Sequence, residues 1–179
     1  LTSALVNADV DGEKLSDDEF GFFVIMLAVA GNETSRNAIT HGMIAFSQHP
    51  EQWELLRRNP ELAGQAADEV IRIASPVWHF RRTATRDLEL GDQHVRAGDK
   101  VVIWFGAANR DPGVFADPHG LDLQRDPNPH VAFGVGPHFC LGAHLAKLEI
   151  KVWLEEMIPY LPRLELAAEP VRLRSNFFN

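Results

Sequence analysis

Apolar residues recur at helical spacing along four stretches of the chain, and proline or glycine stands near most of their ends. Residues 16–48 predict a single helix of about 32 residues, roughly 48 Å long, which opens on an acidic capping-box pattern at Ser16. Shorter helices are predicted over residues 50–58 and 61–74, each ending just before an X-Pro step. The last stretch, residues 141–160, predicts a fourth helix.

Between residues 82 and 112 the pattern changes from helical to extended. Short apolar runs at 88–90 and 100–104 predict strands, separated by glycine-containing turns. A further strand is predicted at 163–166, whereas residues 111–129, rich in Pro, Asp and Gly, predict an irregular meander. The sequence therefore predicts a mainly α protein with a small β-sheet.

Composition narrows the class of protein. The 179 residues are 45% hydrophobic and 23% charged, which is enough for one sizeable core. A net charge of −8 without a basic stripe argues against a nucleic-acid partner. A single cysteine excludes an internal disulfide, and the longest apolar run, residues 22–30, is too short to cross a bilayer. With no signal peptide or membrane anchor visible, the sequence predicts a cytoplasmic protein.

The one cysteine, Cys140, lies in residues 133–142, Phe-Gly-Val-Gly-Pro-His-Phe-Cys-Leu-Gly, which we call the cysteine loop. Gly134, Gly136 and Gly142 lack a Cβ, so the main chain can turn sharply and lie flat against a bulky planar partner. Cys140 stands just before the last predicted helix, where free N–H groups and the helix dipole favour a thiolate. An anionic sulfur facing a flat, glycine-lined surface suits the iron of a haem group.

The cysteine loop resembles the haem-binding loop of cytochromes P450, whose pattern is F-G-x-G-x-H-x-C-x-G. All six fixed positions match, and a chance match in a chain of this length has a probability on the order of 10⁻⁶. The resemblance implies a haem b cofactor (iron protoporphyrin IX) with Cys140 as the iron ligand. It also implies that the loop contacts the haem through Phe133, Gly134, His138 and Gly142.

Residues 30–34, Ala-Gly-Asn-Glu-Thr, lie in the middle of the longest predicted helix and resemble the acid–alcohol pair of the P450 central helix. The resemblance implies that Thr34 and Glu33 are catalytic residues, which deliver protons during oxygen activation in a pocket kept dry. The residues alone leave a structural alternative open, in which Glu33 is solvated and Thr34 bonds back to a carbonyl of its own helix.

Glu69 and Arg72 form an E-x-x-R pattern in the third predicted helix. An exposed pair at this spacing contributes only a few tenths of a kcal/mol, about 0.2–0.5 kcal/mol, and a surface pair is the simplest interpretation of the residues alone. In cytochromes P450, however, such a pair joins an arginine ahead of the cysteine loop in a buried ion triad. The resemblance therefore implies a structural triad of Glu69, Arg72 and Arg125.

The carboxylates at the edge of a buried haem need cationic or N–H partners. The resemblance implies that Arg82 contacts one haem propionate and that His138 contacts a propionate as well. Arg81 and His79 stand close enough in sequence to be alternatives to Arg82.

The resemblance covers essentially the whole chain, residues 1–179, in the order of elements of the C-terminal half of a P450. The chain is therefore expected to be a partial P450 haem domain whose N-terminal half is missing. Such a fragment should expose a large apolar face, hold haem weakly and be inactive by itself.

For the complete protein, the resemblance implies an oxidoreductase that inserts one oxygen atom of O₂ into an unactivated C–H bond of a hydrophobic small molecule. Residues 30–42 and 175–179 resemble the actinobacterial group that hydroxylates sterol side chains or methyl-branched lipids. A ferredoxin and a ferredoxin reductase are the expected electron donors, with basic residues steering an acidic partner. Lys147 and the Arg81/Arg82 pair are the candidates, and plain solvation of each is the alternative.

Two other classes of function stay open at this point. The first is a haem-thiolate protein that transfers electrons or senses a gas without oxygenase activity, which would not need Thr34. The second is a non-haem metal site that combines Cys140 and His144 with His138 or His130. Zinc usually requires four ligands at characteristic spacings, which this sequence does not supply convincingly.

Overall fold

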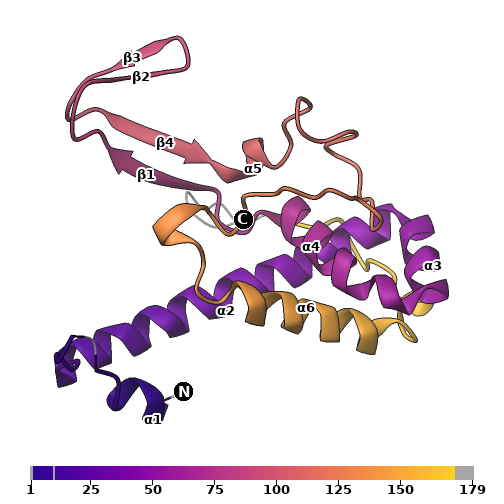
Figure 1. Ribbon diagram of the computed structural model, residues 1–179. Helices are drawn as coiled ribbons and strands as arrows, with labels where there is room; N and C mark the ends of the chain where they lie inside the picture. Colours follow the sequence, from indigo (N-terminus) through magenta and orange to yellow (C-terminus); the bar gives the residue numbers. More distant parts are fainter. Residues whose placement is uncertain (1, 10, 172–179) are drawn as a thin grey trace.

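The computed structural model describes residues 2–9 and 11–171. Over these residues the fold is mainly helical with two small antiparallel sheets (Figure 1). The pattern at residues 175–179 lies outside the described residues. In chain order the elements are α1 (Thr2–Val6), α2 (Asp17–Gln48), α3 (Pro50–Arg58), η1 (Pro60–Leu62), α4 (Ala63–Ala74), β1 (His79–Thr83), β2 (Leu88–Leu90), β3 (Gln93–Val95), β4 (Lys100–Trp104), α5 (Phe105–Ala108), η2 (Gly136–His138), α6 (Ala143–Met157) and η3 (Leu161–Arg163).

Helix α2 runs unbroken over 32 residues, as the sequence predicted. The Ser16 hydroxyl accepts the Glu19 N–H at 3.3 Å, and the Ser16 N–H donates to the Glu19 carboxylate at 2.9 Å. These hydrogen bonds lower the pKa of Glu19, the backbone N–H of Ser16 having the largest effect. The predicted capping box is therefore confirmed. The helix ends at Gln48 because Pro50 occupies the first position of α3.

The core lies where the C-terminal half of α2 packs against α4, and α4 in turn packs against α6. Helix α4 contributes more buried core residues than any other element because its apolar residues cover one whole face. Two residues of the meander, Leu121 and Leu123, close the core from the other side. Helices α2, α4 and α6 are thus held as one unit, directly beside the cysteine loop (orange in Figure 1).

The N-terminal half of α2 carries apolar side chains that nothing in the described part of the chain covers. Phe22 is 73% exposed, Ile25 60% and Val29 59%. In Figure 1 this half of the helix projects away from the body toward α1. Exposed apolar surface on this scale marks an interaction surface. The apolar face predicted from the sequence is therefore present.

The structure has two two-stranded antiparallel sheets, where the sequence predicted a single small sheet. Strand β4 pairs with β1, so that His79 lies opposite Trp104. Strand β2 pairs with β3 across a turn at Gly91, whose φ of 63° favours glycine. Together the sheets form an arm that projects from the helices (Figure 1). Strand β1 was not predicted because its sequence, His-Phe-Arg-Arg-Thr, is mostly polar, as its exposure allows.

Three predicted elements differ in the structure. The strand at 163–166 is wrong, since residues 161–163 form η3, and the Leu164 N–H closes its turn by bonding to the Leu161 carbonyl at 3.1 Å. The helix predicted at 141–160 is shorter, because Gly142 is only its N-cap and it ends at Met157. The third predicted helix begins with a 3₁₀ turn, which Pro60 initiates.

Replacing Gly42 by alanine is expected to destabilise the protein. An added Cβ would lie 2.9 Å from a γ-carbon of buried Val70 on α4, and overpacking of this kind costs about 1–3 kcal/mol. Gly31→Ala is the matched control in the same helix, because an added Cβ there meets no described atom within 4 Å. Alanine is favoured over glycine by about 1 kcal/mol in a helix interior. Thermal melts of the full-length protein should therefore rank Gly42→Ala below Gly31→Ala, and the reverse order would contradict tight packing of α2 on α4.

Candidate functional site

The cysteine loop is a turn built on glycines. Gly134 and Gly136 have φ angles of 70° and 72°, which strain any residue with a side chain. The 3₁₀ helix η2 lies at the centre of the loop. The Cys140 N–H donates to the Phe133 carbonyl at 2.9 Å. This hydrogen bond joins the two sides of the turn and fixes the backbone of Cys140.

The Cys140 side chain is exposed and lies just ahead of α6. The Ala143 N–H, at the first position of this helix, bonds to the Cys140 carbonyl at 3.3 Å. The sulfur is thus placed at the N-terminal end of α6 and is accessible. A sulfur held in this way is available as a ligand for a metal ion.

The surface next to Cys140 fits a haem group. Along the chain on both sides of the thiol, large apolar side chains are exposed: Val135, Phe139, Leu141, Leu145 and Leu148. Exposed apolar side chains would pack on the faces of a macrocycle, and glycines at positive φ would allow its close approach. The residues present therefore suit a planar apolar cofactor ligated through sulfur.

Glu69 and Arg72 are both completely buried on α4. The Arg72 Nη2 and Nε atoms donate to the two carboxylate oxygens of Glu69 at 2.7 and 2.8 Å, a bidentate pair. Arg125 from the meander places its Nε 3.1 Å from Glu69 Oε2. The structure thus brings together the three residues that the resemblance grouped.

Further partners satisfy this buried triad. The side-chain amide of Asn128 donates to Glu69 at 3.1 Å, and the Asp122 N–H also donates to Glu69 at 3.1 Å. Arg72 donates hydrogen bonds of 2.8–2.9 Å to the carbonyls of Asn109, Pro118 and Gly120. Helix α4 is therefore bonded to the meander immediately ahead of the cysteine loop.

Asn109 is a completely buried polar residue that sequence reasoning missed. Its side-chain oxygen accepts the Val131 N–H at 2.7 Å, and its amide donates to the Ser75 hydroxyl at 2.9 Å. Ser75 ends α4 in a left-handed conformation. Asn109 therefore links the end of α4 to the start of the cysteine loop. Its local sequence, Ala-Ala-Asn-Arg-Asp, gives no signal of this role because both partners are distant in the chain.

A second polar cluster that the sequence did not reveal centres on Asp68. Its Oδ1 lies 3.1 Å from His130 Nε2 and 2.7 Å from Lys147 Nζ. Partial burial by itself raises the pKa of the Asp68 carboxyl. The hydrogen bonds from His130 and Lys147, together with the positive charge of Lys147, lower this pKa by more, so that it lies below its usual value. The cluster therefore stabilises the folded protein at pH values above the unfolded-state pKa of Asp68. This stabilisation is lost as the pH falls through the lower pKa that Asp68 has in the folded protein.

His130, one of the two further ligands considered for the zinc alternative, is engaged elsewhere. Its Nε2 contacts Asp68, and its Nδ1 accepts the Ala132 N–H at 3.3 Å, so both ring nitrogens are engaged. Among residues 2–9 and 11–171, no group of three or more His, Cys, Asp or Glu side chains is arranged to hold a metal ion.

Thr34 and Glu33 make local contacts within α2. The Thr34 hydroxyl donates to the Ala30 carbonyl at 2.6 Å, and the Glu33 carboxylate pairs with Arg36. The neighbouring Ser35 hydroxyl donates to Glu149 of α6 at 3.0 Å, which places this part of α2 against the helix that follows Cys140.

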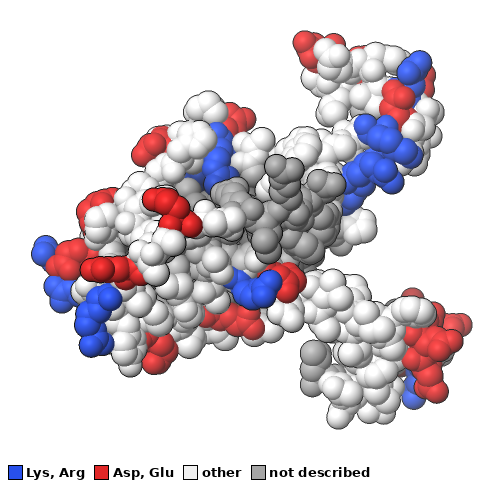
Figure 2. Space-filling view, turned by 180° about the vertical axis from the view of Figure 1, so that it is seen from behind, with Lys and Arg blue, Asp and Glu red and all other residues white. Residues whose placement is uncertain are grey.

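Arg82 lies exposed on β1, and His138 is exposed in η2. The Arg82 guanidinium donates to the Arg81 carbonyl at 3.1 Å and lies over the Phe80 ring, with no carboxylate partner among the described residues. Both Arg82 and His138 are accessible to an anionic group. His79 instead stacks on Trp104 across the ladder, with ring centroids 4.8 Å apart. Figure 2 shows that Lys and Arg side chains gather on this β arm.

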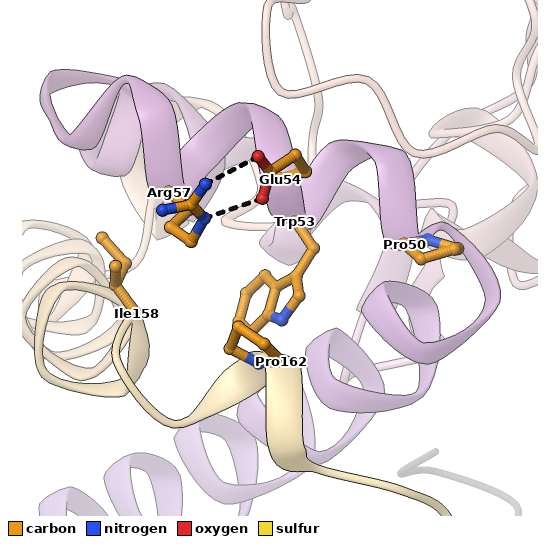
Figure 3. Close-up of a pocket in the computed structure, with 6 residues that line it drawn as sticks. All are labelled: Pro50, Trp53, Glu54, Arg57, Ile158 and Pro162. Carbon is orange, nitrogen blue, oxygen red and sulfur yellow. Dashed lines mark hydrogen bonds and ion pairs between the residues drawn. The ribbon is translucent and has the colours of Figure 1, made fainter.

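One small pocket lies at the other end of α6 and is separate from Cys140. It has a volume of about 180 Å³ and is lined by Pro50, Trp53, Glu54, Arg57, Ile158 and Pro162 (Figure 3). The 15 residues of α6 separate it from the cysteine loop by roughly 22 Å. It therefore takes no part in the site at Cys140.

Comparison with known proteins agrees with this geometry. The family model described as Cytochrome P450 matches residues 1–162. A steroid C26-monooxygenase of Mycolicibacterium smegmatis is 52% identical over 180 residues, covering 100% of this chain and 42% of that protein. A methyl-branched lipid omega-hydroxylase of Mycobacterium tuberculosis is 51% identical over 181 residues, again covering 100% of this chain and 42% of the relative. The chain belongs to the cytochrome P450 family, whose members bind haem b.

Solved structures show the same relationship. A cytochrome P450 of Mycobacterium marinum in complex with pseudoionone matches with a TM-score of 0.92 and 47% identity, covering 99% of this chain and 43% of that one. A cytochrome P450 of Bacillus subtilis matches with a TM-score of 0.86 and 42% identity, covering 94% and 46%. The predicted family and fold class are therefore confirmed, and the chain spans less than half the length of these relatives. In the described part of the chain, no helix combines the length and apolar character needed to cross a membrane.

Proposed function

We propose that this chain forms part of the haem domain of a monooxygenase that hydroxylates an unactivated C–H bond of a hydrophobic substrate. The observation that carries the proposal is the exposed Cys140, fixed by its bond to Phe133 and surrounded by exposed apolar side chains. The similarity to a steroid C26-monooxygenase and a methyl-branched lipid omega-hydroxylase supports the same class of reaction.

Each residue of the site then has a role that its position permits. Cys140 would hold the haem iron through its sulfur, and Gly134, with its positive φ, would allow close approach of the macrocycle. Arg82 and His138, both accessible, would supply the partners for the propionates. When bound, the haem would supply the oxidation, in which O₂, two electrons, two protons and a C–H bond give C–OH and water.

Thr34 and Glu33 are proposed to handle the protons. Because the Thr34 hydroxyl donates its own proton to Ala30, its oxygen is left as an acceptor that can orient a water molecule. The Glu33 carboxylate, held by Arg36 and still 42% exposed, can exchange protons with solvent. The site would thus receive protons through positioned groups without being flooded by water.

The named relatives favour a steroid side chain or a methyl-branched lipid as the substrate, oxidised at a terminal carbon. A ferredoxin with its reductase would supply the electrons. The direct test is to incubate the full-length protein with a cholestane-type steroid or a methyl-branched fatty alcohol, O₂ and a ferredoxin system. A terminally hydroxylated product supports the proposal. Haem reduction without any oxygenated product, from either substrate, would favour electron transfer or gas sensing instead.

Replacing Thr34 by alanine is expected to lower the product formed per O₂ consumed several-fold, because the variant loses the hydroxyl oxygen that would orient a water molecule for proton delivery. Thr40→Ala is the matched control. The Thr40 hydroxyl makes the same kind of bond, to the Arg36 carbonyl at 2.9 Å, in the same helix. Product and O₂ are measured together in each variant. Equal coupling in the two variants would show that Thr34 is only a structural hydroxyl.

A further inference from the structure

One carboxylate oxygen contacts both sides of the cysteine loop. Asp68 Oδ1 accepts from His130, three residues before the loop begins, and from Lys147, on α6 after Cys140. The two contacts, at 3.1 and 2.7 Å, therefore bracket the whole segment that presents the thiolate. Bonds between residues this far apart in sequence restrict the relative movement of the segments that they join.

The His130 side chain is 5% exposed, so its hydrogen bonds are not exchanged freely with water. Its Nδ1 accepts from the Ala132 N–H, which leaves the Nε2 proton to be donated to Asp68. His130 thus links Asp68 to the main chain one residue ahead of the cysteine loop. The Asn109 bond to the Val131 N–H at 2.7 Å fixes the residue between them.

Both partners of Asp68 also contact Phe133, the first residue of the cysteine loop. The ring centroids of His130 and Phe133 are 5.8 Å apart, and Lys147 Nζ lies 5.8 Å from the Phe133 ring. The Phe133 carbonyl in turn accepts the Cys140 N–H. A continuous set of contacts therefore leads from Asp68 through Phe133 to the backbone of Cys140.

Asp68 has a rigid support, because it precedes Glu69 on α4. Glu69 is fixed by the buried triad, so the two successive carboxylates hold different parts of the chain: Glu69 the meander and Asp68 the cysteine loop. Supporting residues on rigid elements are what keep a metal ligand in one orientation. Among the described residues, the charged and titratable groups paired with Asp68 are His130 and Lys147.

We propose that Asp68 is a positioning residue for the haem ligand, which holds the entry to the cysteine loop through His130 and the exit through Lys147. It acts on Cys140 through these residues and does not touch the haem itself. Lys147 is accordingly engaged in this cluster and is less available for steering a ferredoxin. This inference rests on the proposed haem-thiolate site.

The test compares Asp68→Ala with Glu155→Ala in the full-length, haem-loaded protein. Glu155 pairs with Lys151 at 2.5 Å, with side chains 40% and 41% exposed, and both residues lie farther along α6 from Cys140 than Lys147 does. Removing an outer-shell partner of a metal ligand typically costs 10–100-fold in affinity. Asp68→Ala should therefore release haem to apomyoglobin about 10-fold faster, and a smaller fraction should show the thiolate-type band after reduction and CO treatment. Glu155→Ala should match the wild type in both.

Each outcome decides a distinct point. If Asp68→Ala keeps the wild-type rate of haem release and the wild-type band, the positioning role is wrong. If Asp68→Ala yields no haem-loaded protein, Lys147→Met decides, since it keeps an unbranched side chain while removing the charge that contacts Asp68 and Phe133. Lys147→Met should shift both readouts in the same direction, and no shift overturns the inference. A wild-type protein without a thiolate-type band would instead overturn the proposed function.

Discussion

Replacing Arg72 by methionine is expected to leave little folded protein. The substitution keeps an unbranched side chain but removes the charge beside Glu69, whose side chain is 1% exposed. Removing one partner of a buried ion pair costs about 3–5 kcal/mol, against a total stability of about 5–15 kcal/mol for a typical domain. Three carbonyls also lose a hydrogen-bond donor. The yield and melting temperature of the full-length protein measure the effect.

The chain offers a matched control, because Glu54 and Arg57 repeat the E-x-x-R spacing on α3. Arg57 binds both Glu54 carboxylate oxygens at 2.7 Å, and the hydrogen bonds from Arg57 and Arg58 lower the pKa of Glu54 to about 2. The Arg57 and Glu54 side chains are nevertheless 49% and 40% exposed, so water and salt screen their attraction. Arg57→Met should therefore change the melting temperature little. Equal losses in the two variants would contradict the conclusion that burial decides the effect.

These two pairs also show that residue spacing alone does not predict which pair is buried. Glu54–Arg57 and Glu69–Arg72 have the same spacing, and both make bidentate contacts. What separates them is the meander, which covers only the second pair and brings Arg125 and Asn128 to it. Burial of this kind depends on contacts between segments about 50 residues apart. The resemblance to a family, rather than the spacing, therefore selected the correct pair.

Features set by neighbouring residues could be predicted well. The start of α2 follows from Ser16 and Glu19, and its end from Pro50. The turn of the cysteine loop follows from glycines at positive φ, and its position ahead of α6 follows from the apolar spacing after Cys140. In each case the physical cause lies within a few residues of the structure that it produces.

Features set by distant partners could not be predicted. Asn109 and Asp68 look like ordinary polar residues until the fold places Val131 beside one and His130 with Lys147 beside the other. The missed strand β1 has the same cause, since a mostly polar strand is defined by its partner β4 rather than by its own alternation.

Replacing Cys140 by serine is expected to abolish the thiolate-type band of the reduced, CO-treated protein, together with any monooxygenase activity. A serine hydroxyl is not ionised at neutral pH and cannot replace the electron donation of a thiolate. The substitution is nearly isosteric on an exposed side chain, and the Cys140 N–H bond to Phe133 belongs to the backbone. The melting temperature of the protein without haem should therefore change little, which separates loss of the ligand from loss of the fold.

Measured together with the wild type and Thr34→Ala, the same variant distinguishes the three classes of function. A monooxygenase loses both the band and the product with Cys140→Ser, while Thr34→Ala keeps the band and loses coupling. A haem-thiolate electron carrier or gas sensor would also lose the band with Cys140→Ser, but its wild type would form no product, and Thr34→Ala would change nothing. A zinc protein would show no such band even as the wild type. His130 is already bonded at both ring nitrogens, so a zinc site at Cys140 would have to use His144 and His138 instead.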